Sequence, residues 1–311
     1  MASPHGPGIA LVDKPGGMTS HDVVSRARRA LGTRKIGHAG TLDPLATGLL
    51  LLGVDSATRL LTYLVGLDKT YEATIRLGSA TDSDDSDGEV IMRADAGTLA
   101  AVDAEAIRAP IAALTGRISQ VPSTVSAIKV GGRRAYDLAR AGEEVVLASR
   151  EVTVSRFEVR DIRHSGEAVD LDVVVDCSSG TYIRALARDL GAALNVGGHL
   201  TALRRTRVGP FDVADAVTPD DIATEPLLGP AEVAVRVLGG ITVTDAEASA
   251  LRHGQRLTGA AGRIDGEHAA AIDPAGDLIG VVGRRGEDLK SLMNLPTGSA
   301  ADAAAEAGGA R

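Results

Sequence analysis

The 311-residue chain has no tryptophan, four tyrosines, two phenylalanines and a single cysteine, Cys177. One cysteine excludes an intrachain disulfide. No C-x-x-C pair or H-E-x-x-H sequence is present to bind zinc, so we expect no metal. The longest apolar run, 48–54, is too short to span a bilayer, and residues 1–8 lack the basic and apolar regions of a signal peptide. These absences favour a cytoplasmic protein with no membrane segment.

Basic residues are outnumbered, and the formal net charge of −8 taken alone argues against a nucleic-acid partner. The distribution of charge points the other way. Acids gather at 82–89 and in the last third, while bases form three separate groups that could line one groove. Any single group is more often a solvated surface. The groups are Arg26, Arg28, Arg29, Arg34 and Lys35; Lys129, Arg133 and Arg134; and Arg204, Arg205 and Arg207.

The length suits about two domains, and 44% hydrophobic residues can build a core. Strands and helices are interleaved without a regular strand-helix-strand rhythm, which predicts the α+β class. No glycine-rich phosphate loop ending in Lys-Ser/Thr is present, which argues against nucleotide hydrolysis and hydride transfer. The acidic stretch 82–89 is expected to be a loop, and it lacks the order and length of an EF-hand.

Hydrophobic periodicity and capping residues predict the individual elements. Strands are expected at 9–12, 49–54, 69–77, 152–163 and 168–177, the last two as antiparallel neighbours. Helices are expected at 21–31, 56–64, 104–114, 135–141 and 181–194. A second, β-rich unit is expected to contain alternating runs around 235–243 and 269–282 and a helix at 244–251.

The segment 37–50 (G-H-A-G-T-L-D-P-L-A-T-G-L-L) places one carboxylate, Asp43, among apolar and glycine residues. Its glycines allow sharp turns, Pro44 biases Asp43 toward extended backbone, and Leu42 and Leu45 flank the carboxylate with hydrocarbon. Such surroundings can isolate a reactive acid. The local pattern also fits a helix N-cap at Asp43 with Pro44 at the first helical position, which needs no function. The two interpretations are compatible.

Six segments in order carry a resemblance to a known family. They are D-K-P with Gly17, Thr19 and Ser20 (13–20), the segment 37–50, K-T-Y (69–71), Q-V-P-S-T-V-S-A-I-K (120–129), G-T-Y-I-R (180–184) and H-L-T-A-L-R-R-T (199–206). Together they resemble the pseudouridine synthases, specifically the bacterial tRNA pseudouridine synthase B (TruB) family, which is related to dyskerin. The resemblance extends from about residue 12 to 211.

This resemblance implies a pseudouridine synthase fold. We therefore expect an α+β protein with a mixed, mainly antiparallel central sheet flanked by helices, a catalytic cleft, and a small β-rich C-terminal domain similar to a PUA domain. The implied boundaries are a flexible N-terminus at 1–8, a catalytic domain at 9–234, the PUA-like domain at 235–295 and a disordered tail at 296–311.

The resemblance also implies roles for individual residues. The aspartate of the family's G-H-x-G-x-L-D-P motif is the essential catalytic carboxylate, and it maps onto Asp43. No cofactor is implied. Substrate contacts are implied for Lys14, His38, Tyr71, Tyr182, Arg184 and Leu203. Contacts with RNA phosphates are expected for Lys14, Lys129, Arg204 and Arg205.

Local interpretations compete with several of these roles. Tyr71 could be a cross-strand packing ring rather than a platform for an extruded base. A cation at a helix start is not helped by the helix dipole, so a buried carboxylate partner such as Asp43 would explain Arg184, although a surface arginine is the simpler local interpretation. His38 could be a satisfied loop histidine rather than a residue that helps open an RNA loop. Cys177 is expected in the core.

The implied reaction is the isomerisation of uridine 55 in the T-loop of tRNA, without a guide RNA, by a monomer. An ionised aspartate can attack C1′, add to C6 of the base, or remove the C2′ proton, and each route needs an unprotonated carboxylate. Burial alone would protonate Asp43, and an adjacent Arg184 would keep it charged. The target base must first be flipped out of its stack.

Two other functions remain open at this level. A non-catalytic RNA-binding protein or tRNA chaperone could use the same cleft, but an acid facing a flipped sugar would only repel phosphates there. The second alternative is a related pseudouridine synthase that acts on ribosomal RNA or on several sites. The form G-H-A-G-T-L-D-P and the absence of an S4-like N-terminal module favour the tRNA enzyme.

Overall fold

The computed structural model describes residues 6–123, 129–130, 133–134 and 147–296. Within them, nine strands form one long sheet with the order β1-β3-β12-β4-β11-β10-β7, to which β2 (pairing β3) and β13 (pairing β12) are added. The strands are β1 (Gly8–Lys14), β2 (Ile36–Ala39), β3 (Thr47–Val54), β4 (Lys69–Leu77), β7 (Gly116–Gln120), β10 (Arg150–His164), β11 (Val169–Cys177), β12 (Gly198–Val208) and β13 (Phe211–Asp212).

Neighbouring strands of this sheet are antiparallel except β3 and β12, which run parallel where Gly48 lies beside Arg205. The expected mixed, mainly antiparallel sheet is therefore confirmed. The predicted pairing of 152–163 with 168–177 is also confirmed, as β10 with β11.

Strand β3 is apolar along most of its length because both faces of the sheet are covered there. Leu50 and Leu52 belong to one core, together with the buried faces of α1 (Ser20–Ala30) and α6 (Ile183–Ala193). Leu49 and Leu51 belong to a second core on the opposite face. This second core includes residues of the C-terminal region and therefore joins the two parts of the molecule.

Helix α1 begins at Thr19, whose side chain accepts a hydrogen bond from the Asp22 N–H while Asp22 accepts from the Thr19 N–H. This capping box fixes the helix start beside the loop that follows β2. The other helices are α2 (Leu61–Val65), α3 (Ala96–Ala100), α4 (Arg108–Ala113), α7 (Pro230–Leu238) and α8 (Asp245–Arg252), with short hairpins β5–β6 (Ser79–Thr81, Val90–Arg93) and β8–β9 (Lys129–Val130, Arg133–Arg134).

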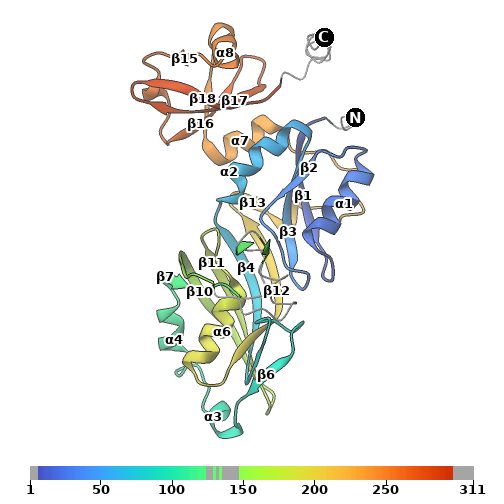
Figure 1. The fold of residues 1–311 in the computed structure, drawn as a ribbon, viewed down its shortest axis with the longest axis vertical. Coiled ribbons are helices and arrows are strands. Elements are labelled where there is room, and N and C mark those ends of the chain that lie inside the picture. Colours follow the sequence, from blue (N-terminus) through green and yellow to red (C-terminus); the bar gives the residue numbers. More distant parts are fainter. Residues whose placement is uncertain (1–5, 124–128, 131–132, 135–146, 297–311) are drawn as a thin grey trace.

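The C-terminal region forms a separate five-stranded sheet at one end of the elongated molecule, orange to red in Figure 1. Its order is β14-β16-β17-β18-β15, and it has its own core with α8. The strands are β14 (Gly240–Thr242), β15 (Arg256–Leu257), β16 (His268–Ile272), β17 (Leu278–Arg285) and β18 (Asp288–Asn294). The expected small β-rich C-terminal domain is present, and helices α2 and α7 lie between it and the long sheet (Figure 1).

Several local predictions were wrong. The segment expected as one helix at 56–64 begins as a 3-10 helix, Asp55–Leu60, without a side-chain cap and turns α-helical only at α2. The run around 235–243 begins inside α7, which starts at Pro230 and buries Val233 and Ala234. Only β14 is extended. The helix expected at 104–114 is limited to α4.

Other predictions fall outside the described residues. These are the helix at 135–141, all but residue 296 of the tail at 296–311, and most of the N-terminal segment 1–8. The domain boundaries stay a prediction, and the one placed at residue 235 falls within α7.

Candidate active site

The loop that carries Asp43 is irregular and connects β2 to β3. No helix begins there, so the N-cap interpretation of Asp43 was wrong. The loop is held from outside instead: Ser20 Oγ accepts a hydrogen bond from the Leu42 N–H (2.9 Å) and donates one to the Leu42 carbonyl (3.1 Å). Lys14 Nζ donates to the Pro44 carbonyl (3.3 Å). The carboxylate is thus presented by backbone anchored on both sides of it.

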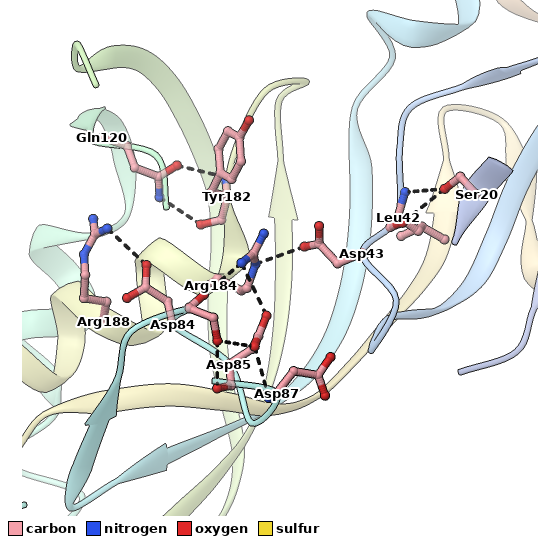
Figure 2. A network of polar contacts seen from close by, with 11 residues as sticks. Ser20, Leu42, Asp43, Asp84, Asp85, Asp87, Gln120, Tyr182, Arg184 and Arg188 are labelled. Atoms are coloured by element: carbon pink, nitrogen blue, oxygen red, sulfur yellow. Dashed lines mark hydrogen bonds and ion pairs between the residues drawn. The ribbon is translucent and has the colours of Figure 1, made fainter. Parts of the chain in front are cut away.

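Asp43 forms an ion pair with Arg184 from the first turn of α6, with 3.0 Å between Asp43 Oδ2 and Arg184 Nε. The Arg184 side chain is 4% exposed. Its Nη1 also lies 3.3 Å from Asp85 Oδ2 and donates to the Ser83 carbonyl at 2.8 Å. Figure 2 shows the guanidinium between the two carboxylates. The sequence-based expectation that Arg184 meets Asp43 agrees with this geometry.

Opposing effects act on the Asp43 carboxyl. Burial raises its pKa above the ordinary value, the Arg184 charge and hydrogen bond pull the pKa down, and the Asp85 charge raises it. The Asp43 side chain is 37% exposed, because it opens into a pocket while protein surrounds it on the other sides. A carboxylate that is both reachable and poorly hydrated depends on its cation to stay ionised.

The acidic loop 82–89 supplies the second carboxylate of this cluster. Asp85 is buried and accepts hydrogen bonds from Ser83 Oγ and the Asp87 N–H. Asp84, which has a positive φ of 62°, lies 3.2 Å from Arg188 Nη1. The sequence predicted a loop here but gave no role to Asp85, because nothing in a run of acids indicates which arginine each one will meet.

A second pair of contacts fixes the strand-to-helix turn before α6. Gln120 Nε2 donates to the Tyr182 carbonyl at 3.0 Å, and the Tyr182 N–H donates to Gln120 Oε1 at 2.8 Å (Figure 2). Gln120 is buried at the end of β7. Its carboxamide therefore satisfies both backbone groups of a pocket residue, which fixes where that residue's side chain begins. This role of Gln120 was not foreseen from the sequence.

These elements enclose a pocket of about 450 Å³. The pocket is lined by residues from the separate sequence motifs: Gly40, Thr41, Leu42, Asp43, Val65, Lys69, Tyr71, Arg150, Ser179, Gly180, Thr181, Tyr182, Ile183, Arg184, Leu203 and Arg205. Five of the residues that the sequence analysis singled out for catalysis or substrate contact line this one pocket: Asp43, Tyr71, Tyr182, Arg184 and Leu203.

Two of the residues predicted to contact RNA phosphates, Lys14 and Arg205, are buried in the structure. Lys14 is fully buried, donates to the Met18 carbonyl at 2.7 Å, and has its pKa lowered to about 8 by burial. Arg205 is 1% exposed and donates to the carbonyls of Leu49 and Gly40. The phosphate contacts expected for Lys14 and Arg205 do not fit these positions, because their charges are already bound to main-chain oxygens.

The other expected phosphate contacts lie elsewhere. Arg204 forms a two-bond ion pair with Asp13, at 3.0 and 2.7 Å, and remains half-exposed. Lys129 lies in β8. The structure does not bring Arg204 into the pocket with Asp43, and the position of the Lys129 side chain lies outside what the structure describes.

His38 lies in β2 and does not line the pocket. Its ring contacts that of His21 edge-on, with 5.6 Å between centroids, and burial lowers its pKa. His38 therefore lies close to the Asp43 loop in sequence, but its ring contacts His21 rather than the pocket. Cys177 is buried, as expected.

Among the described residues, no group of three or more His, Cys, Asp or Glu side chains is arranged to hold a metal ion. In the same part of the chain, no helix has both the length and the apolar character needed to cross a membrane.

The long mixed sheet with its C-terminal β domain is the fold of pseudouridine synthases. A chain in the crystal structure of the archaeal box H/ACA sRNP Nop10–Cbf5 complex matches with a TM-score of 0.65 at 25% identity, over 93% of this chain and 85% of that one. A chain in an H/ACA RNP bound to a substrate RNA containing 2′-deoxyuridine has the same fold, with a TM-score of 0.67 at 24% identity over 93% and 84%.

Sequence comparison narrows the class further. The model described as "TruB family pseudouridylate synthase (N terminal domain)" matches 28–183, and two C-terminal models, for tRNA pseudouridylate synthase B and tRNA pseudouridine synthase II, match 184–234 and 240–296. The tRNA pseudouridine synthase B of Leifsonia xyli subsp. xyli is 56% identical over 296 residues, covering 94% of this chain and 97% of that protein. The one from Nocardia farcinica is 63% identical over 252 residues (80% and 81%). The chain belongs to the TruB family of pseudouridine synthases, and it is an isomerase.

Proposed function

We propose that this enzyme converts uridine 55 in the T-loop of tRNA to pseudouridine, acting in the cytoplasm as a monomer without a guide RNA or cofactor. The observation that carries the proposal is the Asp43 carboxylate, which opens into the pocket and is paired at 3.0 Å with a nearly buried arginine. The relatives at more than 50% identity that bear the name tRNA pseudouridine synthase B support the choice of tRNA.

In the proposed reaction, the N1–C1′ bond of uridine breaks, the detached base turns, and C5 forms a bond to the same C1′. The C5 proton leaves and N1 gains a proton, so the product is an isomer and no redox partner is needed. Asp43 acts on the nucleoside as an ionised carboxylate, and Arg184 keeps it ionised. The walls of the pocket limit the access of water to the intermediate.

Access to the site requires the target uridine to leave its stack, at a cost of about a few kcal/mol. Tyr71 is 7% exposed, lines the pocket and hydrogen-bonds with Arg205. We assign its ring as the surface against which the flipped base packs, and Tyr182 and Leu203 as further walls of the same space. Arg204, which does not line the pocket, and Lys129 of β8 are assigned to phosphates farther along the RNA, where they fix its register.

The test is tritium release from a tRNA transcript labelled with [5-³H]uridine. Wild-type enzyme is expected to release tritium at one uridine per tRNA. Asp43→Asn is expected to lower the rate by at least about a thousandfold while the protein stays folded. A transcript with cytidine at position 55 is expected to release none.

Three results would contradict the proposal. Release from the cytidine transcript would mean that another uridine is the target. Full activity in Asp43→Asn would remove the carboxylate from the mechanism. Tight tRNA binding without any release by the wild type would favour the non-catalytic chaperone function.

A further inference from the structure

The cationic side chains that line the pocket differ in the protein groups with which they already form hydrogen bonds or ion pairs. Arg184 is shared between Asp43 and Asp85. Lys69 is buried and donates to the carbonyls of Val65 and Leu67. Arg205, buried in the same wall, is likewise bound to carbonyls. These three charges are neutralised or occupied within the protein.

Arg150, at the start of β10, is the exception among the cations that line the pocket in the described part of the chain. Its side chain is exposed, and no hydrogen bond or ion pair engages it there. Its neighbour Glu151 is paired instead with Arg117 of β7, at 3.0 Å. Because successive residues of a strand point to opposite faces, Glu151 lies on the other side of the strand from Arg150.

The position of Arg150 is fixed by the same residue that fixes Tyr182. In the β7–β10 pairing, Arg150 is directly opposite Gln120, whose carboxamide holds both backbone groups of Tyr182. Arg150 and Tyr182 therefore border the pocket from two sides of one buried glutamine. This places an exposed guanidinium on a sheet strand that borders the pocket.

A nucleotide that enters this pocket brings negative charge with it. Its nucleoside fits beside Asp43, but its 5′ and 3′ phosphates each carry about one negative charge, which the carboxylate repels. A guanidinium binds a phosphate through two parallel hydrogen bonds and compensates that repulsion. Of the cations described in the pocket wall, Arg150 is the one that is exposed and has none of its donors engaged within the described residues.

We propose that Arg150 binds a phosphate directly flanking the flipped uridine and so seats the substrate nucleotide in the pocket. This assignment rests on the proposed function for the nature of the substrate. Arg150 is a binding residue for the ground-state complex as well as for the reaction, so its loss raises Kd and KM more than it lowers kcat.

The experiment pairs the protein variants with chemically altered RNA. T-arm stem-loop RNAs are prepared with a single uncharged methylphosphonate on the 5′ or the 3′ side of the target uridine. Kd is measured for wild type and Arg150→Ala with each RNA, and single-turnover tritium release is followed with unmodified RNA.

We expect Arg150→Ala to weaken binding of unmodified RNA about ten- to a hundredfold, to lower the salt slope of log K by about one phosphate contact, and to change the rate at saturating RNA much less. One methylphosphonate should weaken wild-type binding by a similar factor and leave the variant unaffected. Arg150→Lys should recover part of the binding. Arg117→Gln, which removes an exposed arginine from the adjacent strand, is the matched control and should bind as wild type does.

Wild-type affinity in Arg150→Ala would overturn the assignment. So would methylphosphonates that weaken both proteins by equal factors at both positions, because that additivity means no contact between Arg150 and either phosphate. Failure of the proposed function is seen separately, as an absence of tritium release by the wild type.

Discussion

Asp43 and Arg184 meet at 3.0 Å although one comes from an irregular loop and the other from the first turn of a helix. The helix N-terminus does not stabilise a cation, so the position of Arg184 is maintained by two carboxylates and the Ser83 carbonyl. The arrangement lets one buried arginine neutralise Asp43, the proposed catalytic acid, while a second acid, Asp85, holds the arginine in place.

The pH dependence of the reaction should depend on this pair. Since the proposed mechanism needs ionised Asp43, we expect the rate to rise as pH rises through the pKa of Asp43, which burial raises above the ordinary value. Arg184→Met removes the charge that lowers this pKa, so the acidic limb of kcat should move to higher pH by about one unit or more. Single-turnover rates across the acidic range measure the shift.

Arg188→Met is the matched control for that series, because Arg188 is paired with Asp84 and not with Asp43. Its acidic limb should stay near that of the wild type. An unchanged limb in Arg184→Met at any measurable rate would show that Asp43 is not ionised in the limiting step or that Arg184 does not control it.

Gln120 should position Tyr182 without touching the substrate. Gln120→Leu removes both side-chain hydrogen bonds to the Tyr182 backbone, while the Leu186 N–H still donates to the Tyr182 carbonyl, so we expect kcat to fall about ten- to a hundredfold as the pocket wall shifts. Gln120→Glu keeps the acceptor for the Tyr182 N–H and should lose less. Gln255→Leu, in an exposed turn, is the control. Equal losses in Gln120→Leu and Gln120→Glu would contradict a positioning role.

The sequence predicted the parts of this fold that depend on local periodicity. The alternation in β10 and β11 and the apolar run of β3 correspond to strands in the structure, because a half-buried or fully buried strand imposes those patterns. Helix α7 was missed, since its short run of apolar residues fits a strand equally well and only Pro230 signals a helix start.

The site residues that lie in recognisable sequence motifs were predictable. Those whose role depends on burial or on contacts between distant parts of the chain were not. Asp43 and Arg184 were found because each lies in a distinctive segment. Lys14 and Arg205 were given phosphate contacts because sequence shows charge but not burial. Asp85 and Gln120 escaped notice because their importance lies in contacts with residues far along the chain.

The buried Lys14 should make stability depend on pH. The pKa of Lys14 is lowered to about 8 in the folded state, whereas a lysine in the unfolded chain has a pKa of about 10.4. At a pH between these two values the unfolded chain therefore binds more protons than the folded protein. The free energy of unfolding contributed by Lys14 therefore rises as pH increases from about 8 to 10. Relative to Lys14→Met, the wild type should gain about 1–3 kcal/mol over that range in urea titrations.

Using the difference between the two proteins removes the contribution of Cys177, whose raised pKa of about 11 acts in the opposite direction. Lys290→Met, which removes an exposed ammonium from β18, should differ from the wild type by a constant amount. A constant difference for Lys14→Met as well would show that Lys14 does not change its protonation over this range.

The parallel contact between β3 and β12 should depend on the absence of a side chain at residue 48. Gly48 has a φ of +100°, and a Cβ there would lie 2.2 Å from the Arg205 carbonyl oxygen. Gly116 has a similar φ of +90° with nothing within 4 Å of a Cβ. Gly116→Ala should therefore cost about 1–2 kcal/mol from backbone strain alone. Gly48→Ala should cost at least about 3 kcal/mol, because it also forces the two strands apart. Urea unfolding of the two variants separates strain from the strand contact, and equal losses would mean that the strands at Gly48 can part without cost.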